Sequence, residues 1–122
     1  MSDLAEKIRK SRRVEIPVGK MKFFGRRATA AEFVKMSRNG SEDTEVVKML
    51  IDGWENVREN DLFPEGSTKK VDFDRELFNE AIEDLPSIWK PIVEALIKST
   101  SEHFKSTAEN EKTFTLGWGS LV

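Results

Sequence analysis

The 122-residue chain contains no cysteine, a single histidine and no apolar run near the length of a membrane span. Without cysteine, neither a disulfide framework nor a thiolate metal site can form. A membrane-spanning helix needs about 20 consecutive apolar residues, and a secretory signal needs an apolar core behind its basic start. Because the chain has neither pattern, we expect a cytoplasmic protein that does not associate with membranes.

Residues suited to catalysis are also scarce. His103 stands beside Glu102 near the predicted end of a helix, with no nucleophile or ligand cluster at a useful spacing. Gly25-Arg26-Arg27 lacks the glycine spacing and the Lys-Ser/Thr pair of a phosphate-binding loop. Paired acids fall near helix starts or on solvated faces, where the helix dipole favours carboxylates. The pairs are Asp43/Glu45, Asp72/Asp74 and Glu83/Asp84. The sequence therefore predicts no enzyme, no cofactor and no metal site.

The composition of the chain predicts one small folded domain. About 38% of the residues are hydrophobic and 34% are charged, which suits a modest core inside a very polar surface. We expect a flexible basic arm over residues 1–12, a single globular domain over residues 13–106 and a flexible tail over residues 107–122.

Charge is distributed unevenly along the chain. Residues 1–40 hold eleven Lys and Arg against four Asp and Glu, a net charge of +7. The remaining residues hold nine basic and eighteen acidic side chains, a net charge of −9. This asymmetry is typical of a nucleic-acid surface, but it equally suits head-to-tail self-association or two faces that meet different partners. Nucleic acid is the less favoured partner, because no aromatic residues alternate with the early Lys and Arg.

A β-hairpin is predicted over residues 13–26. Apolar side chains alternate with other residues on both sides of Gly19-Lys20. A type II′ turn at Gly19-Lys20 pairs Val18 with Met21 and places the apolar residues of both strands on one face. Pro17 has no N–H to donate, so its strand is predicted to lie at a sheet edge.

Four helices are predicted, over residues 30–38, 42–54, 75–84 and 86–105. The first begins at a capping box formed by Thr29 and Glu32. The last carries a clear apolar stripe at helical spacing. The stripe consists of Ile88, Trp89, Ile92, Val93, Leu96 and Ile97. The expected fold class is mainly α, a compact bundle of about four helices with a small N-terminal β-hairpin and flexible termini.

A long loop separates the second and third of these helices. Residues 55–72 contain Phe63-Pro64, Gly66 and Ser67, which are typical of irregular structure. We expect Leu62 and Phe63 to pack onto the body of the protein.

Trp54 and three apolar residues of the C-terminal tail are candidates for contact with a partner protein, whereas Trp89 is predicted to lie in the core. Trp54 is predicted to fill the junction between its helix and the following loop, and a groove near Trp54 and Trp89 would accept an amphipathic helix. Phe114, Leu116 and Trp118 alternate in the tail and share one side of an extended chain. These three side chains either bind a partner or pack back onto the hairpin of their own chain.

Arg26 and Arg27 form a second candidate binding site. They precede the helix that begins after Thr29, and a helix N-terminus attracts anions. A partner's carboxylates or a phosphate could bind there. The alternative is that both guanidiniums pair with acidic side chains in the second half of this chain.

The order of several short segments carries a family resemblance over roughly residues 14–112. The segments lie at residues 14–18, 23–33, 46–47, 51–57, 73–77, 85–86 and 108–112, and the fourth reads Ile51-Asp52-Gly53-Trp54-Glu55-Asn56-Val57. In this order they resemble the tail assembly chaperones encoded by long-tailed phages and prophages. Asn56 stands where the family has a glycine, and the loop over residues 59–70 is longer and more charged than in the family.

The resemblance implies a non-enzymatic function. Such chaperones bind the very long tape measure protein in the infected host, keep its apolar helices from aggregating and help to recruit tail tube subunits. In many relatives a translational frameshift appends a second domain to some copies. For this chain the resemblance implies the tape measure protein and the tail tube protein as partners, in the host cytoplasm and not in the mature virion. The alternative function is a small nucleic-acid-binding regulator that uses the basic N-terminal 40 residues.

Overall fold

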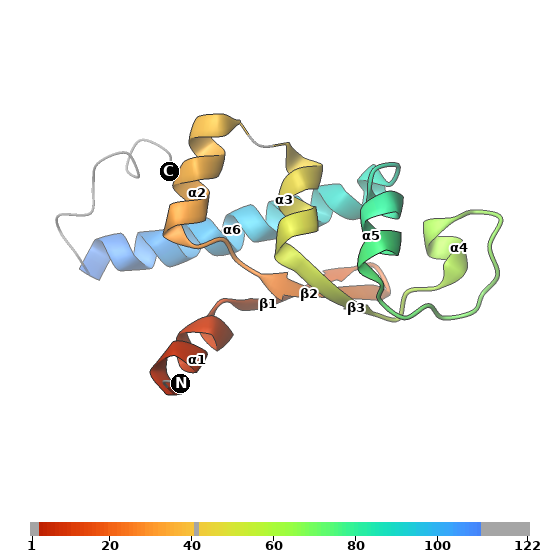
Figure 1. The fold of residues 1–122 in the computed structure, drawn as a ribbon, viewed down its shortest axis with the longest axis horizontal. Helices are drawn as coiled ribbons and strands as arrows, with labels where there is room; N and C mark the ends of the chain where they lie inside the picture. The colour runs from red at the N-terminus through yellow and green to blue at the C-terminus, as the bar shows by residue number, and fades with distance from the viewer. Residues whose placement is uncertain (1–2, 41, 111–122) are drawn as a thin grey trace.

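The computed structural model describes residues 3–40 and 42–110, which form six helices and one three-stranded antiparallel sheet. The strands are β1 (Arg13–Val18), β2 (Met21–Arg26) and β3 (Ile51–Glu55). The helices are α1 (Asp3–Ser11), α2 (Ala30–Asn39), α3 (Asp43–Leu50), α4 (Glu59–Leu62), α5 (Arg75–Ile82) and α6 (Pro86–Asn110). The predicted mainly α bundle with a small hairpin is therefore wrong, because the fold is mixed α/β, with α6 running the length of the molecule (Figure 1).

The predicted helix over residues 42–54 is in fact a helix followed directly by a strand. Helix α3 ends at Leu50, and Ile51 takes an extended conformation with φ −94° and ψ 132°. The register of β3 against β2 shifts between Phe24 and Gly25, which is a β-bulge. The bulge lets Ile51 and Trp54 both face inward although they are three residues apart. A spacing of three also fits a helix, and this coincidence explains the error.

The predicted hairpin is present, with the predicted register. β1 and β2 are antiparallel, and Val18 lies opposite Met21. Gly19 has a φ of +60°, as the first central residue of a type II′ turn requires. β1 is an edge strand, so the missing N–H of Pro17 does not interrupt hydrogen bonding in the middle of the sheet.

Gly25 allows the junction between α3 and β3 to lie very close to the backbone of β2. A Cβ atom at Gly25 would lie 2.2 Å from the carbonyl oxygen of Leu50 and 2.9 Å from the Cδ1 of Ile51. Only glycine fits at position 25, because a side chain there would overlap these two atoms.

Asn56 has a left-handed backbone conformation, with a φ of 59°. Glycine adopts this conformation without steric cost, and asparagine is one of the few other residues that tolerate it. The Asn56 Nδ2 donates to the carbonyl of Lys20 at 2.9 Å, which ties the end of β3 to the hairpin turn. Asparagine therefore adopts at this position a backbone conformation that is otherwise typical of glycine.

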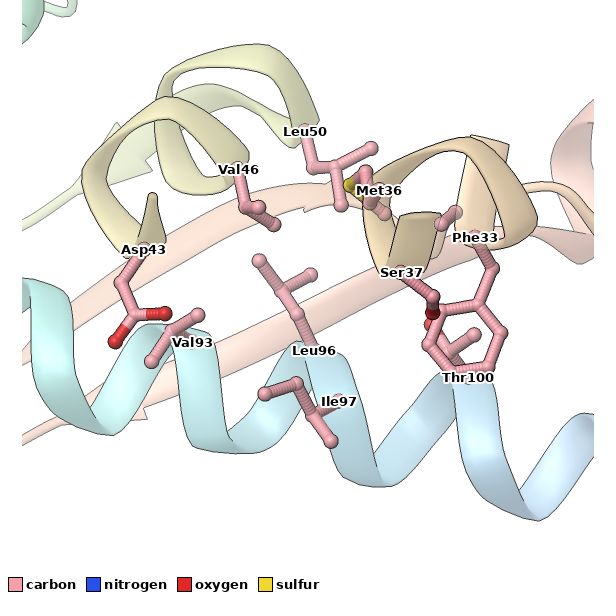
Figure 2. A pocket seen from close by; sticks show the side chains of 11 residues that line it. Phe33, Met36, Ser37, Asp43, Val46, Leu50, Val93, Leu96, Ile97 and Thr100 are labelled. Carbon is pink, nitrogen blue, oxygen red and sulfur yellow. The ribbon is translucent and has the colours of Figure 1, made fainter. Parts of the chain in front are cut away.

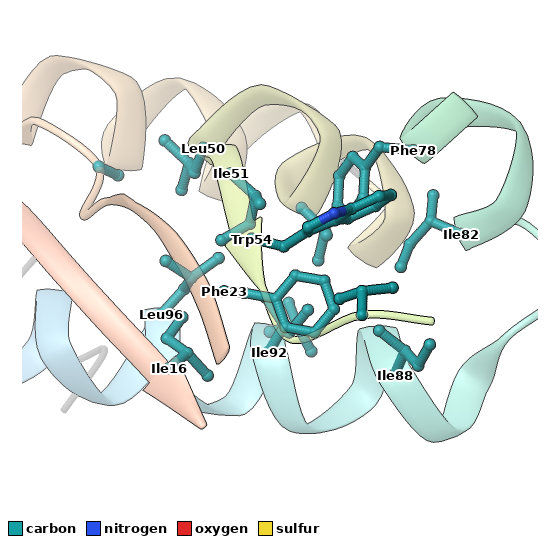
Figure 3. Packing of buried hydrophobic residues seen from close by; sticks show 14 residues of the cluster. Ile16, Phe23, Leu50, Ile51, Trp54, Phe78, Ile82, Ile88, Ile92 and Leu96 are labelled. Atoms are coloured by element: carbon teal, nitrogen blue, oxygen red, sulfur yellow. The ribbon is translucent and has the colours of Figure 1, made fainter. Parts of the chain in front are cut away.

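The core lies between the inner face of the sheet and α6 (Figure 3). Its centre is an aromatic cluster formed by Phe23, Trp54, Phe73 and Phe78. Neighbouring ring centroids in this cluster are 5.1–6.2 Å apart, within the range of favourable edge-to-face and tilted contacts. Ile88 and Ile92 of α6 are buried with the cluster. The sheet and α6 thus pack closely against each other near the start of α6.

Several boundaries differ from the predicted ones. Residues 3–11, expected as a flexible arm, form helix α1, although none of its side chains is buried. Within the expected loop, α4 forms a single turn, and Leu62 packs against the core. Phe63 is 57% exposed, so the prediction that it packs onto the body is wrong. Helix α6 continues through Pro91, whose position in the second turn removes one backbone hydrogen bond.

Candidate protein-binding groove

An apolar groove of about 160 Å³ lies between α2, α3 and α6 (Figure 2). Its lining residues are Ala28, Phe33, Met36, Ser37, Asp43, Val46, Leu50, Val93, Leu96, Ile97 and Thr100. Most of them are apolar, and Figure 2 shows Val46 of α3 and Leu96 of α6 pointing toward one another. The groove is open to solvent and therefore accessible to another molecule.

Helix α6 forms the floor of the groove. Val93, Leu96, Ile97 and Thr100 follow the i, i+3, i+4, i+7 spacing that places side chains on one helical face. Leu96 is buried, whereas Ile97 is 52% exposed although it belongs to the same stripe. The apolar stripe of α6 is therefore wider than the surface that α2 and α3 cover.

Helix α2 forms one wall, and the sequence fixes its first turn firmly. The Glu32 amide donates to Thr29 Oγ1 at 3.2 Å, and the Thr29 amide donates to Glu32 Oε1 at 2.9 Å, which confirms the predicted capping box. At the other end of the wall, Gly40 caps α2 with a φ of 62° and donates to Met36. Phe33 stacks on Phe104 of α6 with a centroid distance of 5.5 Å.

Arg26 holds the start of α2 by a bidentate ion pair. Its Nη1 and Nη2 donate to the two carboxylate oxygens of Glu32 at 2.7 and 2.8 Å. These hydrogen bonds, together with that from the Thr29 amide, lower the pKa of Glu32 to about 2 despite its partial burial. Arg26 is half-buried, so its role in the folded chain is to position the wall of the groove.

The polar groups of the groove are few. Figure 2 shows the Asp43 carboxylate near the first turn of α3 and the hydroxyls of Ser37 and Thr100 at the other end of the groove. A mostly apolar lining with a small number of polar groups is the usual character of a recognition site. The groove therefore suits an apolar side chain on a partner rather than a charged ligand.

Of the predicted partner-binding residues, Arg26, Arg27 and Trp54 are among the described residues, and none of the three lines this groove. Trp54 is only 9% exposed, and its Nε1 donates to the carbonyl of Val71 at 2.7 Å, so it joins the β3 strand to the following loop. Arg27 is buried, and its Nη1 donates to the carbonyl of Ala28 at 3.0 Å. Phe114, Leu116 and Trp118 lie outside the described residues. Trp54 belongs to the hydrophobic core, and the partly buried Trp89 packs against that core.

A signal for the observed groove was present in the sequence. The stripe of α6 included Ile97, and a stripe that adds this residue to Val93 and Leu96 is wide enough to exceed a single packing surface. The position of α3 is tied to strand β3, which follows it directly and which was not predicted from the sequence.

The described part of the chain provides no cluster of three or more side chains able to hold a metal ion. None of its helices combines the length and the apolar character that crossing a membrane requires.

The fold and the groove define a small mixed α/β protein with an open apolar groove on its surface. Comparison with protein-family models, with curated proteins and with solved structures gives no match.

Proposed function

We propose that this chain is a tail assembly chaperone of a long-tailed phage, which binds the tape measure protein in the host cytoplasm and helps to recruit tail tube subunits. The groove between α2, α3 and α6 binds the apolar face of a tape measure helix. The protein acts by binding and catalyses no reaction. The order of segments that resembles this family supports the proposal from the sequence.

The groove is the observation that supports the proposal from the structure. A cavity of about 150 Å³ accommodates a benzene ring, so a groove of about 160 Å³ has room for one Leu or Phe side chain. The half-exposed Ile97 extends the apolar surface beyond the groove. An amphipathic helix presents side chains at i, i+3 and i+4, and one would enter the groove while its neighbours cover Ile97. Each copy would shield only a short stretch of client, so a long tape measure protein requires many copies.

Co-expression tests this proposal directly. The chain is produced together with the tape measure protein encoded in the same phage genome, and the soluble fraction of the tape measure protein is measured. We expect Ile97→Asp to lower that fraction to the level found without the chaperone, because a carboxylate on the groove floor opposes apolar contact.

Phe63→Asp is the matched control for Ile97→Asp. Phe63 is exposed to a similar extent, at 57% against 52%, but lies next to α4 and outside the groove. The control variant should keep the tape measure protein soluble. Equal solubility with Ile97→Asp and with the unmodified chain, both folded, would exclude the groove as the client site.

A further inference from the structure

A cavity of about 470 Å³, separate from the groove, is lined by four arginines and lies where α1, β1 and the start of α2 meet. Its lining residues are Arg9, Arg12, Arg13, Arg26, Thr29 and Glu32. Arg13 is paired with Asp52 at 2.6 and 2.9 Å, and Arg26 is paired with Glu32. Arg9 and Arg12 form no ion pair with any residue in the described ranges. This basic cavity therefore holds two cationic side chains available to an anionic partner.

Arg27 adds a further positive charge near the basic cavity. Only 9% of Arg27 is exposed, and it too has no ion pair within the described part of the chain. Burial, and then the charge of Arg12, lower the pKa of Arg27. Burial, and then the charges of Arg27 and Arg12, likewise lower the pKa of His103. Positive charge in this region is thus in excess, and a bound carboxylate would reduce the repulsion.

An acidic cluster lies on α3, on α5 and just after the end of α5. It consists of Glu45, Glu80 and Glu83, all exposed. Lys48 pairs with Glu83, and the pKa of Lys48 is raised first by that hydrogen bond and also by the charges of Glu45 and Glu80. The nearby Arg75 guanidinium donates to the backbone carbonyls of Lys48 and Ile51. Three carboxylates therefore outnumber the two cations around them, Lys48 and Arg75.

We propose that the basic cavity of one copy binds the acidic cluster of a second copy, so that copies of this chain associate head to tail. The two surfaces belong to different elements, α1 with the start of α2 on one side and α3 with α5 on the other (Figure 1). An interface between two different surfaces is heterologous, and each added copy leaves one surface of each kind unoccupied. Association therefore continues beyond two copies, into open chains or closed rings. The interface uses neither the groove nor the residues that line its floor.

A second copy fits the basic cavity better than a nucleic acid does. No aromatic side chain lines the cavity, so it offers no platform on which a base could stack. The acidic cluster, by contrast, presents separate carboxylates that match separate arginines in charge.

Sedimentation velocity at low and high salt tests the proposal on the full chain. At about 50 mM NaCl we expect the average mass to increase with protein concentration, and at about 500 mM the protein should remain monomeric, because exposed charges are screened. Arg9→Gln/Arg12→Gln removes charge from the basic cavity, and Glu80→Gln/Glu83→Gln removes charge from the acidic cluster. Each double variant should weaken self-association by about tenfold or more, which corresponds to 1.4 kcal/mol.

Mixing the two double variants separates a head-to-tail interface from other charge effects. Each variant retains one intact surface, so the mixture should form 1:1 pairs of two copies and no larger species. Unchanged circular dichroism and thermal unfolding would show that both variants are folded. A monomeric wild-type protein at low salt, a mixture that forms no pairs, or an arginine variant that loses only binding to a DNA or RNA oligonucleotide would each overturn the proposal.

Discussion

Helix α6 packs against two regions of very different character, the aromatic cluster and the groove. Near its start, Ile88 and Ile92 lie under the aromatic cluster, where large rings fill the space between the sheet and α3 and α5. Further along, Val93, Leu96 and Ile97 line the groove together with Phe33 and Val46. The apolar stripe of α6 is continuous across both regions. The stripe is closed under the aromatic cluster and open at Ile97, which is 52% exposed.

Along α6, the residues that stabilise the fold therefore differ from the residues that are open to a partner. Close packing around the aromatic cluster supplies dispersion and apolar burial, which dominate the folding free energy. The groove leaves apolar area exposed to water, and covering it with a partner would recover that free energy as affinity. Substitutions in the aromatic cluster should therefore lower the free energy of unfolding, whereas substitutions in the groove should weaken the binding of a partner.

The largest effect is expected for Phe23→Ala in the aromatic cluster. Phe23 is fully buried and contacts the rings of Trp54 and Phe78, so its loss leaves a cavity that rigid neighbours cannot fill. We expect the free energy of unfolding in urea to fall by about 3–5 kcal/mol. Phe63→Ala is the matched control and should change it by less than about 0.5 kcal/mol, since Phe63 is mostly exposed. Equal losses would show that the cluster is not the centre of the core.

Gly25→Ala should have the next largest effect. The new methyl group would lie 2.2 Å from the Leu50 carbonyl oxygen, and backbone on both sides must move to relieve the overlap. We expect a loss of roughly 1–3 kcal/mol in urea denaturation. Gly53→Ala is the control in the neighbouring strand, where the nearest atoms are 3.7 Å away. If both variants unfold at the same urea concentration, the close approach of the α3–β3 junction to Gly25 of β2 does not occur in solution.

The sequence predicted elements with a local signal and missed the one that depends on contacts distant in sequence. The hairpin follows from alternation around Gly19-Lys20, and the start of α2 follows from Thr29 and Glu32. Strand β3 has no such signal, because the bulge gives Ile51 and Trp54 a spacing that also suits a helix. Only pairing with β2 and the absence of a side chain at Gly25 make the strand favourable.

The candidate site was harder to predict than the elements that form it. The apolar positions of α2 and α6 were identified as helical, and their helices exist. Which apolar residues become core and which line an open surface depends on how α2 and α3 lie across α6. Helix α3 runs directly into β3, so the error at Ile51 carried over to the predicted role of Trp54, which is a buried residue of that strand.

A smaller, pH-dependent effect is expected for Glu32→Gln at the wall of the groove. The folded-state pKa of Glu32 is about 2, below its ordinary value of 4.5, so its charge stabilises the fold above pH 4.5. This contribution is lost as the pH falls from about 4.5 to about 2. Because Glu32 is partly exposed, we expect Glu32→Gln to cost about 1–2 kcal/mol at pH 6. The measurement is urea denaturation at a series of pH values.

The outcome at low pH identifies the cause of the Glu32→Gln effect. Glutamine retains an oxygen that can accept the Thr29 amide of the capping box, so the variant mainly removes the charge. The variant and the unmodified chain should approach equal stability near pH 2. A difference that is the same at pH 2 and at pH 6 would indicate that the shape of the side chain, and not its ion pair with Arg26, supports α2.

The smallest change in stability is expected for Ile97→Ala, and it is the most direct test of the difference between the two regions. Ile97 is 52% exposed in the groove, and alanine has a higher helix propensity than isoleucine, so we expect a change of less than about 0.5 kcal/mol. Ile92→Ala, one turn and a residue earlier at a fully buried position, should cost about 2–5 kcal/mol. If Ile97→Ala costs as much as Ile92→Ala, the groove is closed in solution and cannot receive a partner. If it leaves stability unchanged but lowers the solubility of a co-expressed tape measure protein, the same apolar stripe serves folding at one end and binding at the other.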